Sequence, residues 1–114
     1  MTIKARVMAA LADVGFPVYF GGWKATTAGE LPPNIYAAFT TVTQPHTYAD
    51  NRRKGWRHYV YITLWASGTY TSQRQAVIDA LESAGFAVTD DTEDYEDDTK
   101  MFRCSITAFF LEAI

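Results

Sequence analysis

The chain of 114 residues has no long hydrophobic run. No apolar stretch approaches the roughly 20 residues that a membrane-spanning helix needs. The first 14 residues mix charged side chains among the apolar ones, so they lack the uninterrupted apolar stretch of a signal peptide. We therefore expect the protein to stay in the compartment where it is made.

Cysteine and histidine are also scarce, and this excludes several kinds of site. Cys104 is the single cysteine, so no disulfide can form within the chain. With only His46 and His58 beside it, the spacing of a zinc site is absent. Cys104 falls in a strand-like alternation, which predicts a buried structural thiol. His58 falls among strand residues, where we expect a neutral, hydrogen-bonded imidazole rather than a base.

The usual catalytic signatures are missing as well. The chain contains neither G-x-S-x-G nor H-E-x-x-H, and no phosphate-binding glycine motif. The pair Gly21 and Gly22 lacks a following helix and indicates a loop hinge. We expect a protein that is not an enzyme and needs no cofactor or metal. A catalytic site assembled across subunits would escape such motifs, and a pocket at a subunit boundary that holds His58 and a carboxylate would indicate one.

Aromatic residues, in contrast, are plentiful. They make up 15% of the chain, within a hydrophobic fraction of 48%. A surplus of aromatics suits a strand-rich core or a protein interface. The length is that of one domain with one core, so we expect residues 1–114 to form a single domain.

Hydrophobic periodicity predicts two helices, each ended by a glycine. One runs over 3–14 with Thr2 as its cap and Gly15 as its stop, and the other has Thr71 or Ser72 as its cap and Gly85 as its stop. The segment 44–54, with a proline and three consecutive bases, is predicted to be an extended loop. Segments rich in β-branched and aromatic residues predict strands over 16–20, 34–43, 55–66, 86–89 and 100–112.

The two helix ends resemble each other. Residues 10–18 match residues 80–88 at Ala, Leu, Gly, Phe and Val, through either common ancestry or shared helix-ending chemistry. Two units of helix and strand predict an α+β fold: a two-layer sandwich with a mostly antiparallel sheet of four to five strands and both helices packed on one face. The alternation of the last strand predicts that its core face carries Phe102, Cys104, Ile106, Ala108 and Phe110.

Charge is distributed unevenly. The net charge is −3, yet the segment 90–98 (DDTEDYEDD) holds seven of the 13 acids. This segment is either a solvated charged hairpin or loop, a docking surface, or a metal site. A calcium loop is disfavoured, because the glycine and the regular ligand spacing of such loops are missing.

The basic residues gather elsewhere, at Arg52, Arg53, Lys54 and Arg57. With Trp56 and Tyr59 nearby, they could hold a single-stranded nucleic acid by stacking and phosphate contacts, or they could form a solvated or partner-facing loop. If the basic and acidic loops lie on different sides, the basic loop of one copy can meet the acidic loop of the next. Such a heterologous contact closes into a ring when the rotation allows it.

Several short segments together resemble a known family. They are the glycine-ended helices before Phe16 and Phe86, the stretch Tyr48-Ala49-Asp50-Asn51 ahead of an aromatic strand, and the segment 94–102 that leads into the last strand. In this arrangement the chain resembles the small tail-completion or tail-terminator proteins of long-tailed bacteriophages and prophages. The loop around Trp23 and the turn over 68–71 depart from that pattern.

The resemblance implies a structural protein that forms a ring, commonly of six copies, at the head-proximal end of the tail tube. There it would stop tube polymerisation and join the tail to the head connector, after assembly in the host cytoplasm. Its expected partners are further copies of itself, the tail-tube protein and the connector proteins. The alternative is a small cytoplasmic module that contacts nucleic acid or a regulatory partner through residues 52–57. The expected contact residues are Tyr48, Asp50, Asn51, Arg52, Arg53, Lys54, Trp56, Asp94, Tyr95, Glu96 and Asp97.

Overall fold

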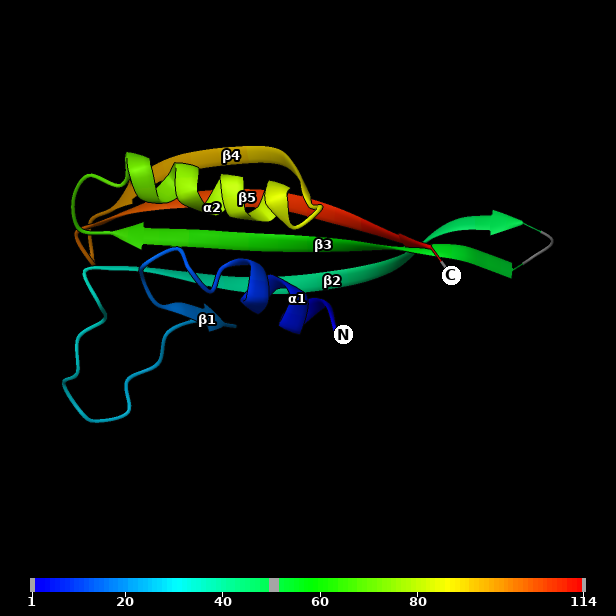
Figure 1. Ribbon diagram of the computed structural model, residues 1–114. Coiled ribbons are helices and arrows are strands. Elements are labelled where there is room, and N and C mark those ends of the chain that lie inside the picture. Colours follow the sequence, from blue (N-terminus) through cyan, green and yellow to red (C-terminus); the bar gives the residue numbers. More distant parts are fainter. Residues whose placement is uncertain (1, 50–51, 114) are drawn as a thin grey trace.

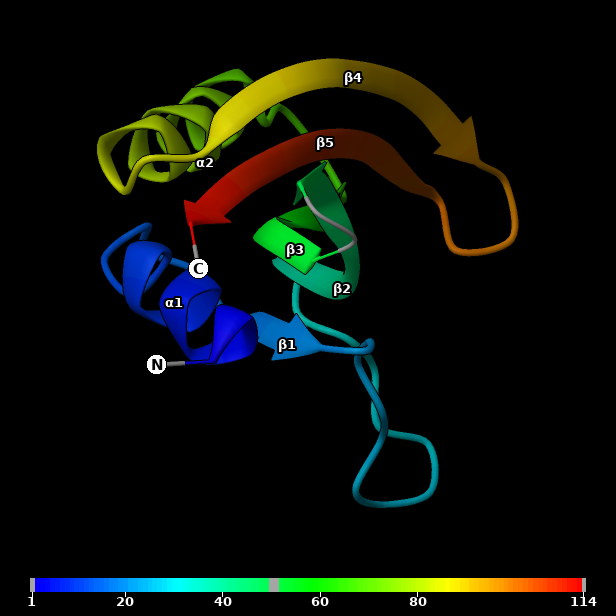
Figure 2. The same cartoon turned by 90° about the vertical axis from the view of Figure 1, so that its right-hand side faces the viewer.

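A computed structural model describes the backbone of residues 2–49 and 52–113 and the side chains of 2–45 and 55–112. The described chain forms one sheet in the order β1-β2-β3-β5-β4, in which β1 runs parallel to β2 and all other neighbours are antiparallel. Both helices lie on the same face of this curved sheet (Figures 1 and 2), which confirms the predicted α+β fold. The elements are α1 (Ile3–Ala10), β1 (Val18–Phe20), β2 (Ile35–Ala49), β3 (Arg52–Ala66), α2 (Thr71–Ser83), β4 (Ala87–Glu96) and β5 (Met101–Ala113).

The helices begin and end largely as their local chemistry dictates. The Thr2 hydroxyl accepts a hydrogen bond from the Ala5 amide at 3.1 Å and caps α1. Helix α1 is shorter than predicted, because after Ala10 the chain tightens into turns that lead to Gly15, at φ 90°. Gly85 follows α2 at φ 93°, so both helices are followed by the predicted left-handed glycine. The predicted cap of α2 is wrong, since Tyr70 occupies that position without a side-chain cap bond.

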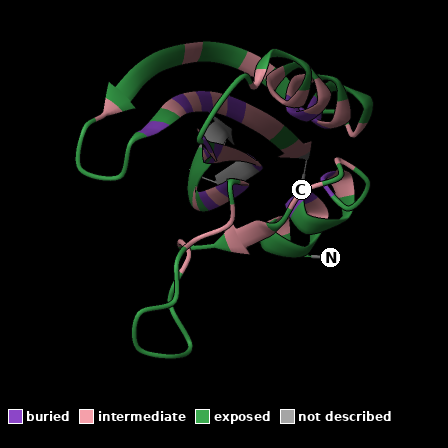
Figure 3. Ribbon diagram, turned by 90° about the vertical axis from the view of Figure 1, so that its left-hand side faces the viewer, coloured by how far each residue is buried: buried purple, intermediate pink, exposed green. Residues whose placement is uncertain are grey.

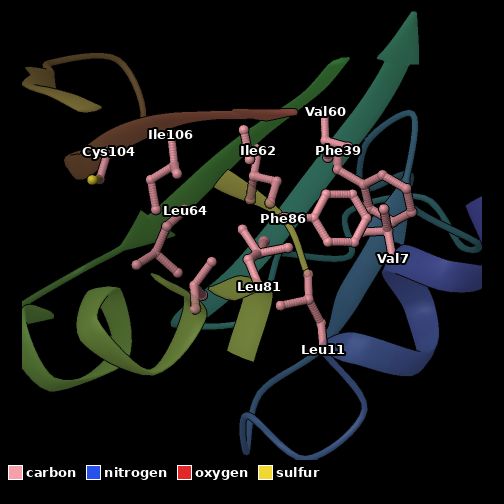
Figure 4. Close-up of a cluster of buried hydrophobic side chains, with 13 residues drawn as sticks. Val7, Leu11, Phe39, Val60, Ile62, Leu64, Leu81, Phe86, Cys104 and Ile106 are labelled. Carbon is pink, nitrogen blue, oxygen red and sulfur yellow. The ribbon is translucent and has the colours of Figure 1, made fainter. Parts of the chain in front are cut away.

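The core lies between the helices and the sheet (Figure 4). Leu11 and Leu81, which correspond in the repeated segments, are 2% and 0% exposed and meet the same cluster. The strands contribute alternate residues to it, as a half-buried sheet requires. The other buried members of the cluster are Val7, Ala37, Phe39, Val60, Ile62, Leu64, Val77, Phe86, Cys104, Ile106 and Ala108.

Strands β2 and β3 are longer than predicted, and the predicted loop over 44–54 is wrong. Their pairing continues past Thr43 and His58 as far as Ala49 and Arg52, with irregular register between Pro45 and Tyr48. Proline is tolerated in β2 because this part of the strand has a neighbour on one side only in the described sheet. The two strands project as a long hairpin beyond the body of the molecule, at the right of Figure 1.

The acidic segment is also more regular than predicted. Residues 90–96 continue strand β4, which pairs with β5 as far as Glu96 and Met101 and has a bulge between Val88 and Asp90. Of the two predicted forms, hairpin or loop, the segment takes the hairpin, with a turn over residues 97–100 in which Lys100 has a φ of 57°. The two strands form a hairpin whose β4 side is largely exposed (Figure 3).

One predicted core residue is not buried. Cys104, Ile106 and Ala108 lie in the core as expected, and Phe110 packs against it, but Phe102 is 40% exposed. Phe102 pairs with Ala66, the last residue of β3, and α2 begins only at Thr71. The helix therefore starts too late in the chain to cover this part of the sheet.

Candidate interaction surfaces

The predicted contact residues fall into two groups at opposite ends of the molecule. One group lies at the end of the β2–β3 hairpin, and the other at the end of the β4–β5 hairpin (Figure 1). Strand β3 runs between them, since Gly55 pairs with Ala113 and Ala66 pairs with Phe102. Eleven residue steps of strand correspond to roughly 36 Å, and the longest extent of the molecule is 54 Å. We name residues 48–54 the basic end and residues 90–98 the acidic end.

At the basic end the structure describes the backbone but few side chains. Tyr48 lies in β2, and Arg52, Arg53 and Lys54 lie in β3, but their side chains fall outside the described part of the chain. Asp50 and Asn51 fall outside it altogether. The described backbone of the basic end therefore belongs to paired strands.

Trp56 and Arg57 do not extend the basic end as one surface. They are successive residues of β3, so their side chains point to opposite faces of the sheet. The Arg57 Nη1 atom donates a hydrogen bond to the Tyr59 hydroxyl at 3.1 Å, and the guanidinium lies 5.9 Å from the Tyr59 ring centroid and 6.0 Å from that of Phe109. Arg57 is thus engaged with aromatic side chains of the sheet.

Two arginines outside the set of predicted contact residues bind the carboxylates of the acidic end. Arg74 of α2 pairs with Asp91 and, at 3.8 Å from its Nε atom, with Glu93. Arg103 holds both carboxylate oxygens of Asp94, with N–O distances of 2.9 and 2.6 Å. Its Nη1 atom is 3.5 Å from Glu96. Such fork-shaped contacts fix the carboxylates in place.

This pairing reduces the negative charge of the acidic end without cancelling it. Arg74 and Arg103 pair with four of its seven acids, and Lys100 follows two residues after Asp98 in the sequence, so counting all three bases leaves four negative charges in surplus. The Arg103 guanidinium lowers the pKa of Asp94 below its ordinary value, mainly through the hydrogen bond between them. Asp94 is therefore ionised at neutral pH, and the acidic end is an electronegative surface.

An aromatic notch lies beside these acids. It is a cavity of about 320 Å³ lined by Tyr70, Glu93, Asp94, Tyr95 and Phe102. The Phe102 ring centroid lies 5.0 Å from that of Tyr95 and 5.9 Å from that of Tyr70. Burial, with a smaller contribution from the hydrogen bond that its hydroxyl makes to Glu93, raises the pKa of Tyr70 to about 12. Asp94 and Tyr95 are among the predicted contact residues, whereas Tyr70 and Phe102 are not.

The face of the sheet opposite the helices, here called the open face, carries further aromatics. Tyr36 stacks on Trp65 with centroids 6.2 Å apart, and Tyr59 stacks on Tyr61 at 6.3 Å. A cavity of about 380 Å³ lies over these strands and is bordered by Trp23. Alternation in β2 and β3 could have revealed this face, because the odd positions of β3 from 59 to 65 are tyrosine, threonine and tryptophan.

The described groups that could perform chemistry are engaged in structural contacts. The Nδ1 atom of His58 lies 2.8 Å from the Thr43 hydroxyl and its Nε2 atom lies 3.1 Å from Glu112. The predicted hydrogen-bonded imidazole is thus confirmed. A carboxylate does accompany it, but neither His58 nor Glu112 lines the notch or the open-face cavity.

Cys104 is fully buried, which confirms the predicted buried thiol. Burial raises the pKa of its thiol, so the thiolate that a metal requires is disfavoured. The ligand atoms of Asp91, Glu93 and Cys104 all lie within 4.8 Å of one another. However, Arg74 binds Asp91 closely through two of its nitrogen atoms and competes with a metal ion for that carboxylate, while its contact with Glu93 is looser, at 3.8 Å. This trio is a poor fit for a metal ion.

The comparisons with known proteins give a likeness in structure but none in sequence. No protein-family model and no curated protein matches the chain. Among solved structures, a chain of the "Virion of native gene transfer agent (GTA) particle" superposes with a TM-score of 0.55 and is 11% identical in sequence. The match covers 95% of this chain and 84% of that chain. The two chains therefore share a fold over almost their whole lengths. No helix among the described residues is long and apolar enough to cross a membrane.

Proposed function

We propose that this protein is a structural component of a phage-like particle, and more specifically a tail terminator or tail-completion protein. The observation that carries the proposal is the shared fold with a chain of a gene transfer agent virion over 95% of this chain. The sequence resemblance to tail-completion proteins, in the glycine-ended helices and the segments around 48–51 and 94–102, supports the same role. In that role the protein caps the head-proximal end of the tail tube and joins it to the head connector.

The form of the molecule suits a ring of identical copies. The basic and acidic ends lie on opposite ends of an elongated sheet, so a contact between unlike ends leaves one end of each copy available for the next. Contacts of this heterologous kind produce closed rings when the rotation between copies divides a full turn. We propose six copies, as the resemblance implies.

Edge strands supply a second means of joining copies. Strand β1 pairs with β2 only as far as Phe39, so the following residues of β2, 40–44, have β3 alone as a described neighbour. These residues are Thr, Thr, Val, Thr and Gln and carry no charge. An uncharged, exposed edge is the kind that accepts another strand.

A structural rather than catalytic role agrees with the engagement of His58 and Cys104 in structural contacts. We propose the tail-tube protein, the connector proteins and further copies of this chain as its partners. Assembly would take place in the host cytoplasm and the finished protein would reside in the virion tail. The competing role, nucleic-acid binding through residues 52–57, is disfavoured because Arg57 is engaged with Tyr59 and Phe109 and the far end is acidic.

Electron microscopy of tail tubes tests the proposal. Purified protein is added to tubes that lack this component, and the ends are imaged. We expect a ring at one end of each tube. As a matched pair, Arg52→Glu/Arg53→Glu should lose the rings, whereas Lys4→Glu/Lys24→Glu, with the same change of charge elsewhere on the surface, should keep them. Bare ends with the unaltered protein, together with salt-dependent retention on a nucleic-acid column, would replace the proposal with the binding-module role.

A further inference from the structure

The notch at the acidic end exists because helix α2 starts too late to cover it. Tyr95 and Phe102 pair across β4 and β5 on the helix side of the sheet, but α2 begins at Thr71. Both rings stay exposed, at 49% and 40%. Tyr70 closes one side of the cavity, and the outer end of the β4–β5 hairpin is open to solvent (Figure 3). The result is an aromatic surface hollow rather than a filled core.

Two carboxylates are held at the rim of this hollow. The Tyr70 hydroxyl donates a hydrogen bond to Glu93, and Arg103 holds Asp94 from the other face of the sheet. Their side chains nevertheless remain 56% and 55% exposed, so they can accept further donors. Both carboxylates are therefore positioned before any ligand arrives.

Aromatic rings beside carboxylates select a cation. A lysine or arginine side chain gains from the faces of the rings and from the carboxylates at once. An anion such as a phosphate would face the four surplus negative charges of the acidic end. The hollow of about 320 Å³ also leaves room for the methylene groups of such a side chain to lie against the rings while its charged end stays near the carboxylates.

We propose that the notch of Tyr70, Glu93, Asp94, Tyr95 and Phe102 binds a lysine or arginine side chain from the basic end of a second copy. This inference rests on the proposed ring and identifies one of its contacts. The sequence places three consecutive bases at 52–54. Within one molecule these residues are separated from the notch by the length of β3, so the two meet only between molecules.

A mixing experiment tests the contact on the intact protein by sedimentation velocity at low salt. The first variant, Tyr95→Ala, damages the notch and keeps the basic end. The second, Arg52→Glu/Arg53→Glu, damages the basic end and keeps the notch. The control, Tyr61→Ala, removes a tyrosine that is 44% exposed on the open face. We expect Tyr95→Ala to weaken self-association roughly 3- to 30-fold, the charge reversal to weaken it more, and the control to leave it unchanged.

Mixing the two damaged variants gives the decisive result. One intact notch then meets one intact basic end, so we expect dimers at concentrations where each variant alone is monomeric. If Tyr95→Ala leaves self-association unchanged, the notch is not the binding site for the basic end. That result would leave the proposed ring and the proposed function unaffected. A mixture that stays monomeric while the unaltered protein associates would also overturn the notch as the binding site. If the unaltered protein is monomeric at about 1 mM, the proposed contact is refuted. The terminator role is tested separately, by the imaging of tube ends.

Discussion

Truncation of Leu81 should be among the most damaging single changes in the protein. Leu81 lies on α2, is 0% exposed, and packs in the cluster that also contains Leu11, Val77 and Phe86. Replacement of a buried leucine by alanine costs about 2–5 kcal/mol, with the larger values where the surroundings cannot collapse into the cavity. A helix packed on a twisted sheet has little freedom to collapse, so we expect Leu81→Ala to lose about 3–4 kcal/mol.

Urea unfolding followed by circular dichroism measures this loss. A domain of this length has a total stability of about 6–17 kcal/mol, so the variant should remain folded in water with a clearly lower midpoint. Leu31→Ala is the control, because Leu31 is 82% exposed and its truncation should change stability by no more than about 0.5 kcal/mol. A loss below about 1 kcal/mol for Leu81→Ala would refute the packing of α2 on the sheet.

Three further predictions concern the backbone and the charged groups. Gly15→Ala and Gly85→Ala should each lose about 1–2 kcal/mol in the same urea assay, because both positions need a left-handed backbone; Gly68→Ala, at a position without positive φ, is the control. The raised pKa of Tyr70, about 12 in the folded protein, means that its stabilising contribution is complete below pH 10 and is lost as pH rises from about 10 to 12. An absorbance titration should show a late-ionising tyrosine that Tyr70→Phe removes, and its persistence in that variant would contradict the assignment. The lowered pKa of Asp94 gives the opposite sign, so its contribution is present at neutral pH and is lost as pH falls below about 4. Carbon-detected NMR should show this pKa rising in Arg103→Gln, and an unchanged pKa would count against the Arg103 pair.

The sequence predicted the helices and the general plan of the fold because those features depend on neighbouring residues. Glycines after apolar stripes mark helix ends wherever they occur, and Gly15 and Gly85 both adopt the left-handed conformation. The alternation of β5 identified Cys104 and Ile106 as core residues, and both are buried. The same alternation failed at Phe102, since no local pattern tells where a distant helix stops covering a strand.

The lengths of the strands could not be predicted, because partners far along the chain set them. The acids of β4 disfavour a strand when considered alone. They are stabilised there by Arg74 and Arg103, which lie 17 and 9 residues from Asp91 and Asp94. The hairpin of β2 and β3 likewise continues through Pro45 because an established register extends outward from the core.

The contact surfaces were predicted only in part, for a similar reason. Runs of charge marked the acidic and basic ends, and the structure separates them along β3. The notch joins residues of α2's cap, β4 and β5, so Tyr70 and Phe102 gave no signal as a group. The contact of Arg57 with the rings of Tyr59 and Phe109 could not be predicted either, because in the sequence Arg57 looks like one more member of a run of bases.

The most direct test of the terminator role is the growth of tail tubes in the presence of the protein. Tube subunits are allowed to polymerise while light scattering follows their length, and the protein is added during growth. We expect elongation to stop at once, at a tube length set by the time of addition, and we expect Arg52→Glu/Arg53→Glu to fail to stop it. Tubes that continue to grow at the same rate after addition of the unaltered protein would contradict the account.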